Sequence, residues 1–204
     1  MKKKRKDGLK RQSDIMKLSL EMFSDRGYHA VSVDDIISAA GIAKGTFYLH
    51  FSGKLEILEM IIDKYLTILY ESVKVLDISM DKSIEDIKKI YLDVTKILLK
   101  EKGFGQFLKI VLRDISSINH ELYGKINTFY VKLVMMSAEF HINAQKKGKI
   151  KKELDPVIAS YCIFGAVKDL VFRLVVLEEK IDIMQSISTM FDLFLGGMLV
   201  EKST

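Results

Sequence analysis

Residues 31–51, VSVDDIISAAGIAKGTFYLHF, constrain the fold most, because their signals leave room only for two short helices joined by a tight turn. Ser32 and Asp35 have the spacing of a capping box, in which each side chain accepts a backbone N–H of the other residue. The first helix would present one apolar face, made of Val33, Ile36, Ile37 and Ala40. Gly41 favours a left-handed cap that ends this helix, so a second short helix has to begin near Ala43.

A longer helix is predicted immediately before this pair. Its apolar residues recur at helical spacing, at Ile15, Leu18, Met22 and Phe23. Gly27 is placed to end it as a left-handed cap. A longer helix followed by two short ones around a glycine-containing turn is the layout of a helix-turn-helix. In that motif the second short helix enters the DNA major groove, with its amino-terminal end nearest the DNA.

Gly45 stands in the first turn of this second short helix, where glycine costs about 1 kcal/mol relative to alanine. Without a side chain at position 45, backbone N–H groups near the helix amino terminus can approach phosphates or base edges. The neighbouring Thr46 offers a hydroxyl for a phosphate oxygen and a methyl for a thymine. We therefore expect the glycine to serve DNA contact rather than local stability.

Other polar and aromatic residues around the second short helix are candidates for the same surface. Phe47 and Phe51 are expected to anchor the helix in the core. Tyr48 has the same core alternative, but we favour DNA contact for it and for His50. The predicted DNA-binding residues are Ser32, Lys44, Gly45, Thr46, Tyr48, His50 and Lys54.

The rest of the chain carries helical periodicity without an alternating strand pattern, and it contains a single proline. That proline, Pro156, follows Asp155, a pairing typical of a helix start. Further helices are predicted from residue 54 and over residues 83–102, 106–116, 121–147, 156–177 and 183–200. The sequence therefore predicts an all-α protein with about nine helices.

The net charge of +5 is concentrated at the amino-terminal end. Seven of the first eleven residues are cationic, namely Lys2, Lys3, Lys4, Arg5, Lys6, Lys10 and Arg11. Such a run suits a polyanion, although taken alone it is more often a solvated tail. The most apolar stretch, residues 159–177, is interrupted by charges, which favours a buried helix over a membrane span. No secretory signal is recognised, so a cytoplasmic location is expected.

Enzyme chemistry finds little support in the sequence. The four histidines show no metal-ligand spacing, and neither a nucleophile elbow nor a phosphate-binding loop is present. The single cysteine, Cys162, lies in an apolar stretch and is expected to be inert. We therefore expect no enzyme, no cofactor and no metal site. A second class stays open: the basic end and apolar helices also suit a peripheral lipid-binding protein.

Residues 11–62 resemble the DNA-binding domain of the tetracycline-repressor (TetR) family of bacterial regulators. The stretch VSVDDIISAAGIAKGTFYLHFSGKLEIL carries the resemblance, with family residues matched at Gly45, Thr46, Tyr48, His50, Phe51 and Lys54. Ala43 departs from the pattern, because many members have a capping serine there. Loss of such a cap typically costs about 1 kcal/mol.

The resemblance implies a variable carboxy-terminal helical domain that binds a small molecule and dimerises. We expect a basic arm over residues 1–10, the helix-turn-helix domain over 11–53 and the effector and dimerisation domain over 54–204. The family implies a dimer whose recognition helices enter successive major grooves of a palindromic operator, about 34–36 Å apart. It also implies a repressor that an effector releases from the operator.

An interior rich in phenylalanine and methionine predicts a hydrophobic effector. The alternative for each pocket residue is that it only fills the core, and for His141 that it is a structural histidine. The predicted pocket residues are Phe104, Phe107, Asn127, Met135, Phe140, His141, Phe164 and Phe172. The last two helices are apolar around more of their circumference than a monomer would hide, which predicts a dimer interface there. Its predicted residues are Tyr161, Gly165, Lys168, Phe172, Phe191, Phe194 and Leu195.

Overall fold

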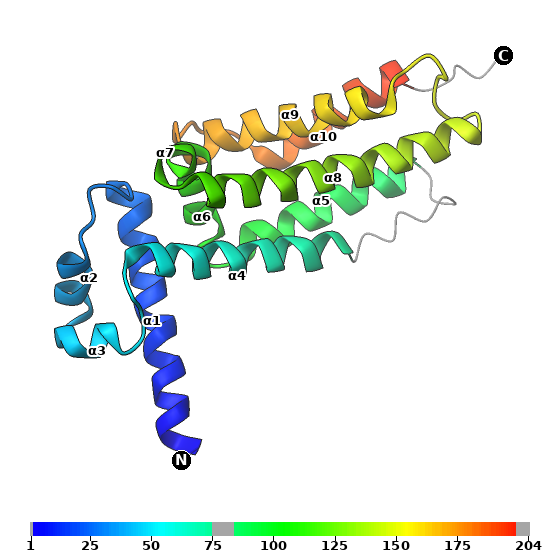
Figure 1. The fold of residues 1–204 in the computed structure, drawn as a ribbon. Helices are drawn as coiled ribbons and strands as arrows, with labels where there is room; N and C mark the ends of the chain where they lie inside the picture. Colours follow the sequence, from blue (N-terminus) through cyan, green and yellow to red (C-terminus); the bar gives the residue numbers. More distant parts are fainter. Residues whose placement is uncertain (1, 75–83, 199–204) are drawn as a thin grey trace. The chain divides into compact units, whose positions relative to one another are not determined.

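The computed structural model describes the backbone of residues 2–74 and 84–198 and confirms the all-α class (Figure 1). The helices are α1 (Lys2–Arg26), α2 (Val33–Ala40), α3 (Lys44–Tyr48), α4 (Lys54–Lys74), α5 (Ile84–Lys100), α6 (Phe104–Arg113), α7 (Ile115–Ile118), α8 (His120–Lys146), α9 (Pro156–Val175) and α10 (Ile183–Met198). Helix α1 packs against α2 and α6, and α2 packs against α3.

The helix boundaries follow the local signals in the sequence. The Ser32 hydroxyl accepts the backbone N–H of Asp35 (3.0 Å), and the Asp35 carboxylate accepts the backbone N–H of Ser32 (2.9 Å). Gly27 and Gly41 adopt left-handed conformations, with φ of 88° and 61°, and end α1 and α2. The carboxylate of Asp155 caps α9 as expected. The predicted caps of these helices are therefore confirmed.

Two boundaries differ from those expected. The described residues form ten helices rather than nine, because the segment expected as one helix over 106–116 is divided at Asp114 into α6 and α7. The Asp114 carboxylate accepts the backbone N–H of Tyr28 (3.4 Å) and pairs with Arg113. In addition, the backbone of α1 is helical from Lys2, so this helix starts earlier than the apolar periodicity from Ile15 indicates.

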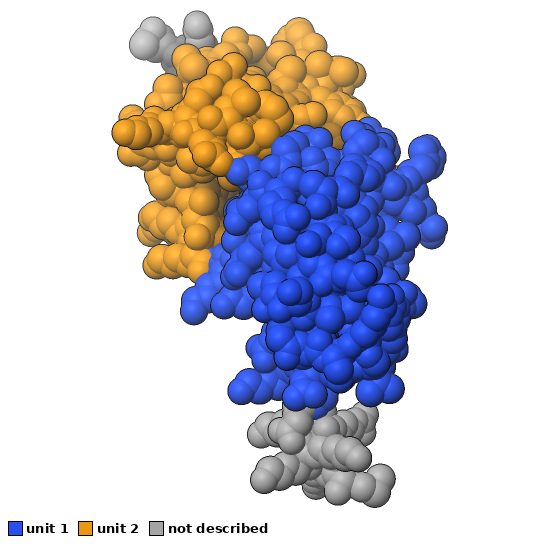
Figure 2. All heavy atoms as spheres, turned by 90° about the vertical axis from the view of Figure 1, so that its left-hand side faces the viewer, with its two compact units in different colours: residues 1–69, 101–123 blue, residues 70–100, 124–204 orange. Residues whose placement is uncertain are grey.

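The chain divides into two compact units, which Figure 2 colours separately. Unit 1 contains residues 1–69 and 101–123, so α6 and α7 share a unit with the helix-turn-helix. Unit 2 contains residues 70–100 and 124–204. The functional domain boundaries expected after residues 10 and 53 remain predictions.

Each unit has its own apolar core. In unit 1 the core of the helix-turn-helix includes Phe23, Val31, Ile36, Phe47 and Phe51. In unit 2, α10 packs against α5 and α9, and its core includes Ala144, Ile163, Ile187, Met190 and Phe191. The Phe191 ring lies 4.8 Å from that of Tyr91 on α5. Packing of this kind, rather than helix propensity, supplies most of the stability of such helices.

Candidate nucleic-acid interface

Helix α3 is held by two aromatic side chains on its inner face. Phe47 is fully buried and Phe51 nearly so, and their ring centroids lie 5.8 Å apart. No side chain caps the start of α3, because Ala43 occupies the N-cap position. Tertiary packing by these two rings therefore fixes a helix of only five residues that would not form on its own.

The outer surface of α3 carries the residues predicted to meet DNA. Lys44, Gly45 and Tyr48 are exposed, with 51% of Tyr48 accessible, while Thr46 and His50 are partly buried. A Cβ atom built at Gly45 would have no atom within 4 Å apart from its chain neighbours and the backbone of its own helix. The backbone of Gly45 is not in the left-handed region either. Neither backbone geometry nor packing within the described chain therefore requires glycine at this position.

Ser32 and Lys44 both have intramolecular acidic partners. The Ser32 hydroxyl donates to the Asp35 carboxylate (2.7 Å), and the Lys44 ammonium donates to Asp34 (2.9 Å). The Asp34 carboxylate raises the pKa of Lys44 by stabilising the ammonium form. Since Lys44 and Asp34 are well exposed, their ion pair is worth little in water. A phosphate can therefore compete for the lysine.

Lys54, which the sequence predicts to contact DNA, has partners within the chain. Its ammonium donates to the carbonyls of Tyr28 (2.9 Å) and Val31 (2.7 Å) and lies 4.4 Å from the centroid of the Tyr28 ring. Partial burial lowers the pKa of Lys54. Lys54 thus fixes the loop between α1 and α2. A phosphate contact by its remaining N–H stays a prediction.

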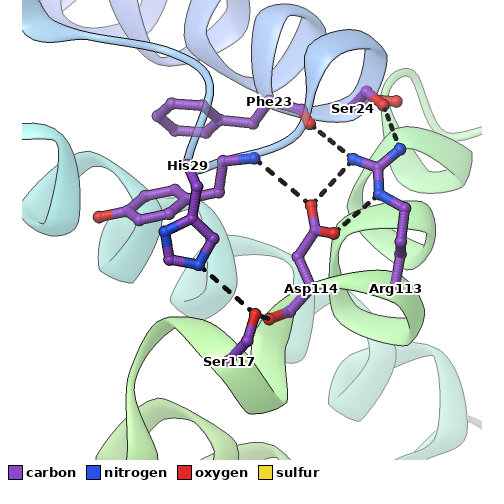
Figure 3. A network of polar contacts seen from close by, with 7 residues as sticks. Phe23, Ser24, His29, Arg113, Asp114 and Ser117 are labelled. Atoms are coloured by element: carbon purple, nitrogen blue, oxygen red, sulfur yellow. Dashed lines mark hydrogen bonds and ion pairs between the residues drawn. The ribbon is translucent and has the colours of Figure 1, made fainter.

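The same loop is held from α6 by a polar network that the sequence did not reveal (Figure 3). The Arg113 guanidinium donates to the backbone carbonyls of Phe23 and Ser24, both at 2.9 Å, at the carboxy-terminal end of α1. It also forms a bidentate pair with Asp114, at 2.8 and 2.9 Å. A guanidinium is well suited to helix-end carbonyls, since these carry the negative end of the helix dipole. Sequence spacing gives no signal for this contact.

The comparison with known families decides the class of protein. Residues 15–61 match the family model described as bacterial regulatory proteins, tetR family, and these residues include α2 and α3. The chain belongs to the TetR family. Residues 107–197 match the model of the YsiA-like protein carboxy-terminal region. This TetR-family protein is therefore a DNA-binding transcriptional regulator. The lipid-binding class considered from the sequence is not supported.

Relatives match over nearly the whole length. The fatty acid metabolism regulator protein of Bacillus subtilis is 25% identical over 191 residues, which are 90% of this chain and 93% of the relative. The fatty acid degradation regulator FadR of Bacillus halodurans has the same fold, with a TM-score of 0.73 at 23% identity, over 92% of this chain and 95% of that one. The structure of the ketosteroid regulator KstR2 of Mycobacterium tuberculosis matches with a TM-score of 0.72 at 20% identity. The match covers 94% of this chain and 96% of that one.

The predicted effector-pocket residues fall in both units. Phe104 and Phe107 are buried in unit 1 and contact the ring of Tyr65, whose hydroxyl donates to the Lys102 carbonyl (2.7 Å). Burial raises the pKa of Tyr65 to about 12. In unit 2, Asn127 and Met135 are exposed, while Phe140, Phe164 and Phe172 are partly buried. Their role as a pocket stays a prediction.

His141 lies in a buried polar cluster of unit 2. Its Nδ1 is 3.0 Å from the hydroxyl of Ser160, which is itself 3.2 Å from the hydroxyl of Ser137. Ser160 also contacts the Pro156 carbonyl at 2.8 Å. Burial lowers the pKa of His141, because the interior disfavours the imidazolium. The alternative considered from the sequence, a structural histidine, accounts for these contacts.

The residues of α9 and α10 that are predicted to form the dimer interface differ in their exposure within the single chain. Phe191 is buried in its own unit, Tyr161 and Lys168 are exposed, and Gly165, Phe172 and Phe194 are partly buried. Leu195 lies outside the side chains that the structure describes. Two further apolar side chains on these helices that the sequence did not single out are exposed, Ile158 at 59% and Leu193 at 74%. Helical periodicity marked both segments as apolar but did not say which residues face outward.

Membrane-spanning helices and metal-binding clusters are both absent from the described residues. None of the described helices is long and apolar enough to cross a membrane. Within residues 2–74 and 84–198 no group of three or more histidine, cysteine or carboxylate side chains is arranged to hold a metal ion.

Proposed function

We propose that this regulator is a dimeric repressor that binds a palindromic operator through α3 and is released by a hydrophobic effector. The observation that carries the DNA-contact assignment is the open space around Gly45, next to the exposed Lys44 and Tyr48. A helix surface without a side chain at its leading edge suits close approach of the main chain to a duplex.

The contacts proposed for DNA are divided by chemistry. Lys44, Ser32, Tyr48 and Lys54 would bind phosphates, and Thr46 a phosphate or a thymine methyl group. His50 would lie at the edge of the same surface. Gly8 of α1 is close to it, since a Cβ built at Gly8 would be 3.8 Å from His50 Cε1.

A hydrophobic effector is favoured by the names of the relatives. They include a fatty acid metabolism regulator, a ketosteroid regulator and a solved complex of SmeT with triclosan. All three names refer to largely apolar molecules. The partly buried phenylalanines of unit 2, including Phe140, Phe164 and Phe172, suit such a ligand.

Dimerisation through α9 and α10 is favoured by their exposed apolar side chains. Ile158 and Tyr161 on α9 and Leu193 on α10 present apolar area to solvent in the single chain. Exposed apolar side chains on neighbouring helices commonly mark a protein interface. Pairing of these helices across a two-fold axis would bury it and set the distance between the two α3 helices.

Release by the effector requires a connection between unit 2 and the DNA-binding helices. Residues 101–123 belong to unit 1, but the chain enters this segment from residue 100 of unit 2 and leaves it into residue 124 of unit 2. Arg113 in this segment holds the end of α1. We propose that the effector displaces this segment, and with it α1. The effector must bind the two arrangements unequally, by about 1–3 kcal/mol for a typical coupling.

The test begins with selection of an operator from random duplex DNA by the full-length chain. The selected sequence is expected to contain an inverted repeat, and footprinting is expected to place each chain on one half-site. Tyr48→Ala should weaken binding at least tenfold while the dimer stays intact by light scattering. A panel of fatty acids, acyl thioesters, steroids and triclosan is then titrated against the complex. No enriched sequence, or no loss with Tyr48→Ala, would contradict the proposal.

A further inference from the structure

Leu49 is the most exposed large apolar side chain in the described part of the chain. It lies at the C-cap of α3, and 82% of its surface is accessible. Its backbone is helical, with φ of −72° and ψ of −20°, and its N–H donates to the carbonyl of Gly45 (3.2 Å). Its position is therefore fixed by the same helix that Phe47 anchors in the core.

The helical periodicity places Leu49 on the outermost line of α3. Successive residues of a helix are rotated by about 100°. Relative to the buried Phe47, Gly45 and Leu49 then lie at about 160° and 200°, on either side of the direction that points straight away from the core. Because Gly45 has no side chain, Leu49 provides the side chain of α3 that points most directly away from the core.

An apolar side chain in this place has a specific chemical partner in DNA. Phosphates and most base edges in the major groove offer hydrogen-bonding or charged groups that leucine cannot use. The C5-methyl group of thymine is the apolar feature of the major groove, and it distinguishes thymine from the other bases. Contact with it would also remove the leucine from water.

We propose that Leu49 reads a thymine of each operator half-site by contact with its methyl group. This inference rests on the proposed function, since it requires α3 to enter the major groove. It adds a residue that specifies sequence to the residues above, most of which bind phosphates. Tyr48, whose ring lies 5.3 Å from that of the buried Phe47 and is held beside it, would bind the neighbouring backbone.

The test uses the operator selected by the full-length wild-type chain. Each thymine of one half-site, and its symmetry mate, is replaced in turn by deoxyuridine, which removes only the methyl group. At one position the wild type is expected to lose about fourfold in affinity per methyl contact, corresponding to about 0.8 kcal/mol for one buried carbon group. Leu49→Ala should bind the thymine and deoxyuridine operators equally, and its affinity for unrelated DNA should equal that of the wild type.

Two matched variants distinguish a methyl contact by Leu49 from a contact by Thr46 and from a general effect of losing a surface leucine. Thr46→Ser removes the methyl group of Thr46 but keeps its hydroxyl, and it should retain the sensitivity to deoxyuridine. Leu99→Ala changes another exposed leucine, 50% accessible on α5, and should behave as the wild type. The thermal midpoint of Leu49→Ala should be unchanged, because the removed atoms are solvated.

Three outcomes would overturn the inference. A deoxyuridine effect that persists in Leu49→Ala would exclude Leu49 as the methyl reader. An effect that disappears in Thr46→Ser would assign the contact to Thr46, and wild-type affinity of Leu49→Ala for the operator would remove Leu49 from the interface. Failure of the wild type to enrich any sequence would instead contradict the proposed function, so the two failures are distinguishable.

Discussion

Arg113 on α6 donates a hydrogen bond of 2.9 Å to the backbone carbonyl of Phe23, 90 residues earlier at the end of α1. A second bond of 2.9 Å reaches the carbonyl of Ser24. The Arg113 side chain is 27% exposed, and its guanidinium is paired with Asp114. These contacts join the segment 101–123 to the first helix of the DNA-binding motif within unit 1.

Replacement of this arginine should therefore affect both stability and regulation. Arg113→Ala removes the charged donor from the Phe23 and Ser24 carbonyls and from the Asp114 carboxylate, while the backbone N–H groups of Gly27 and Tyr28 still donate to Phe23 and Asp114. Hydrogen bonds to charged groups contribute about 1.5–3 kcal/mol, so thermal unfolding should show a loss of that order. Arg113→Lys cannot reproduce the bidentate geometry and should restore only part of it. If Arg113→Ala is as stable as the wild type and responds to the effector in the same way, the contact has no role in stability or regulation.

Gly45→Ala should separate folding from DNA binding. The added methyl group meets no atom within 4 Å, and alanine favours a helix by about 1 kcal/mol over glycine. The free energy of unfolding should be unchanged or larger, while operator affinity falls at least tenfold. Gly105→Ala is the matched control, since Gly105 is also exposed in a helix with no atom near its added Cβ. Gly105→Ala should bind the operator with wild-type affinity. If Gly45→Ala also binds with wild-type affinity, the main chain at position 45 does not approach the DNA closely.

His141 should make stability depend on pH in the acidic range. Its pKa in the folded state is lowered from 6.5 by burial, so below about pH 6.5 the unfolded chain binds more protons than the folded one. The free energy of unfolding should therefore fall as the pH decreases through 6.5 and below. His141→Gln should flatten this dependence, measured by urea denaturation at several pH values. An unaltered profile in the variant would assign the effect to other groups.

Leu193→Lys should weaken the dimer. The residue is 74% exposed in the single chain, so the substitution costs little within the subunit. An unpaired lysine buried in the proposed interface would cost several kcal/mol of association. Sedimentation should show monomers, and operator affinity should fall because one half-site alone binds weakly. Leu99→Lys serves as the control on α5. A dimeric Leu193→Lys would place the interface elsewhere.

Local signals in the sequence determined the helix-turn-helix and most helix boundaries. The capping box of Ser32 and Asp35, the glycines that end α1 and α2, and Asp155 before Pro156 act within a few residues of one another. Their effect depends on backbone geometry that neighbours in the chain fix. For the same reason the residues of α3 could be predicted as DNA contacts before their exposure was known.

Only the tertiary structure decided which side chains meet across the fold. The sequence marked α10 as apolar, but packing against α5 turned Phe191 inward and left Leu193 outside. The sequence predicted Lys54 as a DNA contact, whereas in the structure its ammonium donates to the carbonyls of Tyr28 and Val31. No sequence pattern indicated that Arg113 would contact the end of α1. Such contacts join residues 23 to 90 positions apart, and periodicity within one helix carries no information about the partner that packs against it.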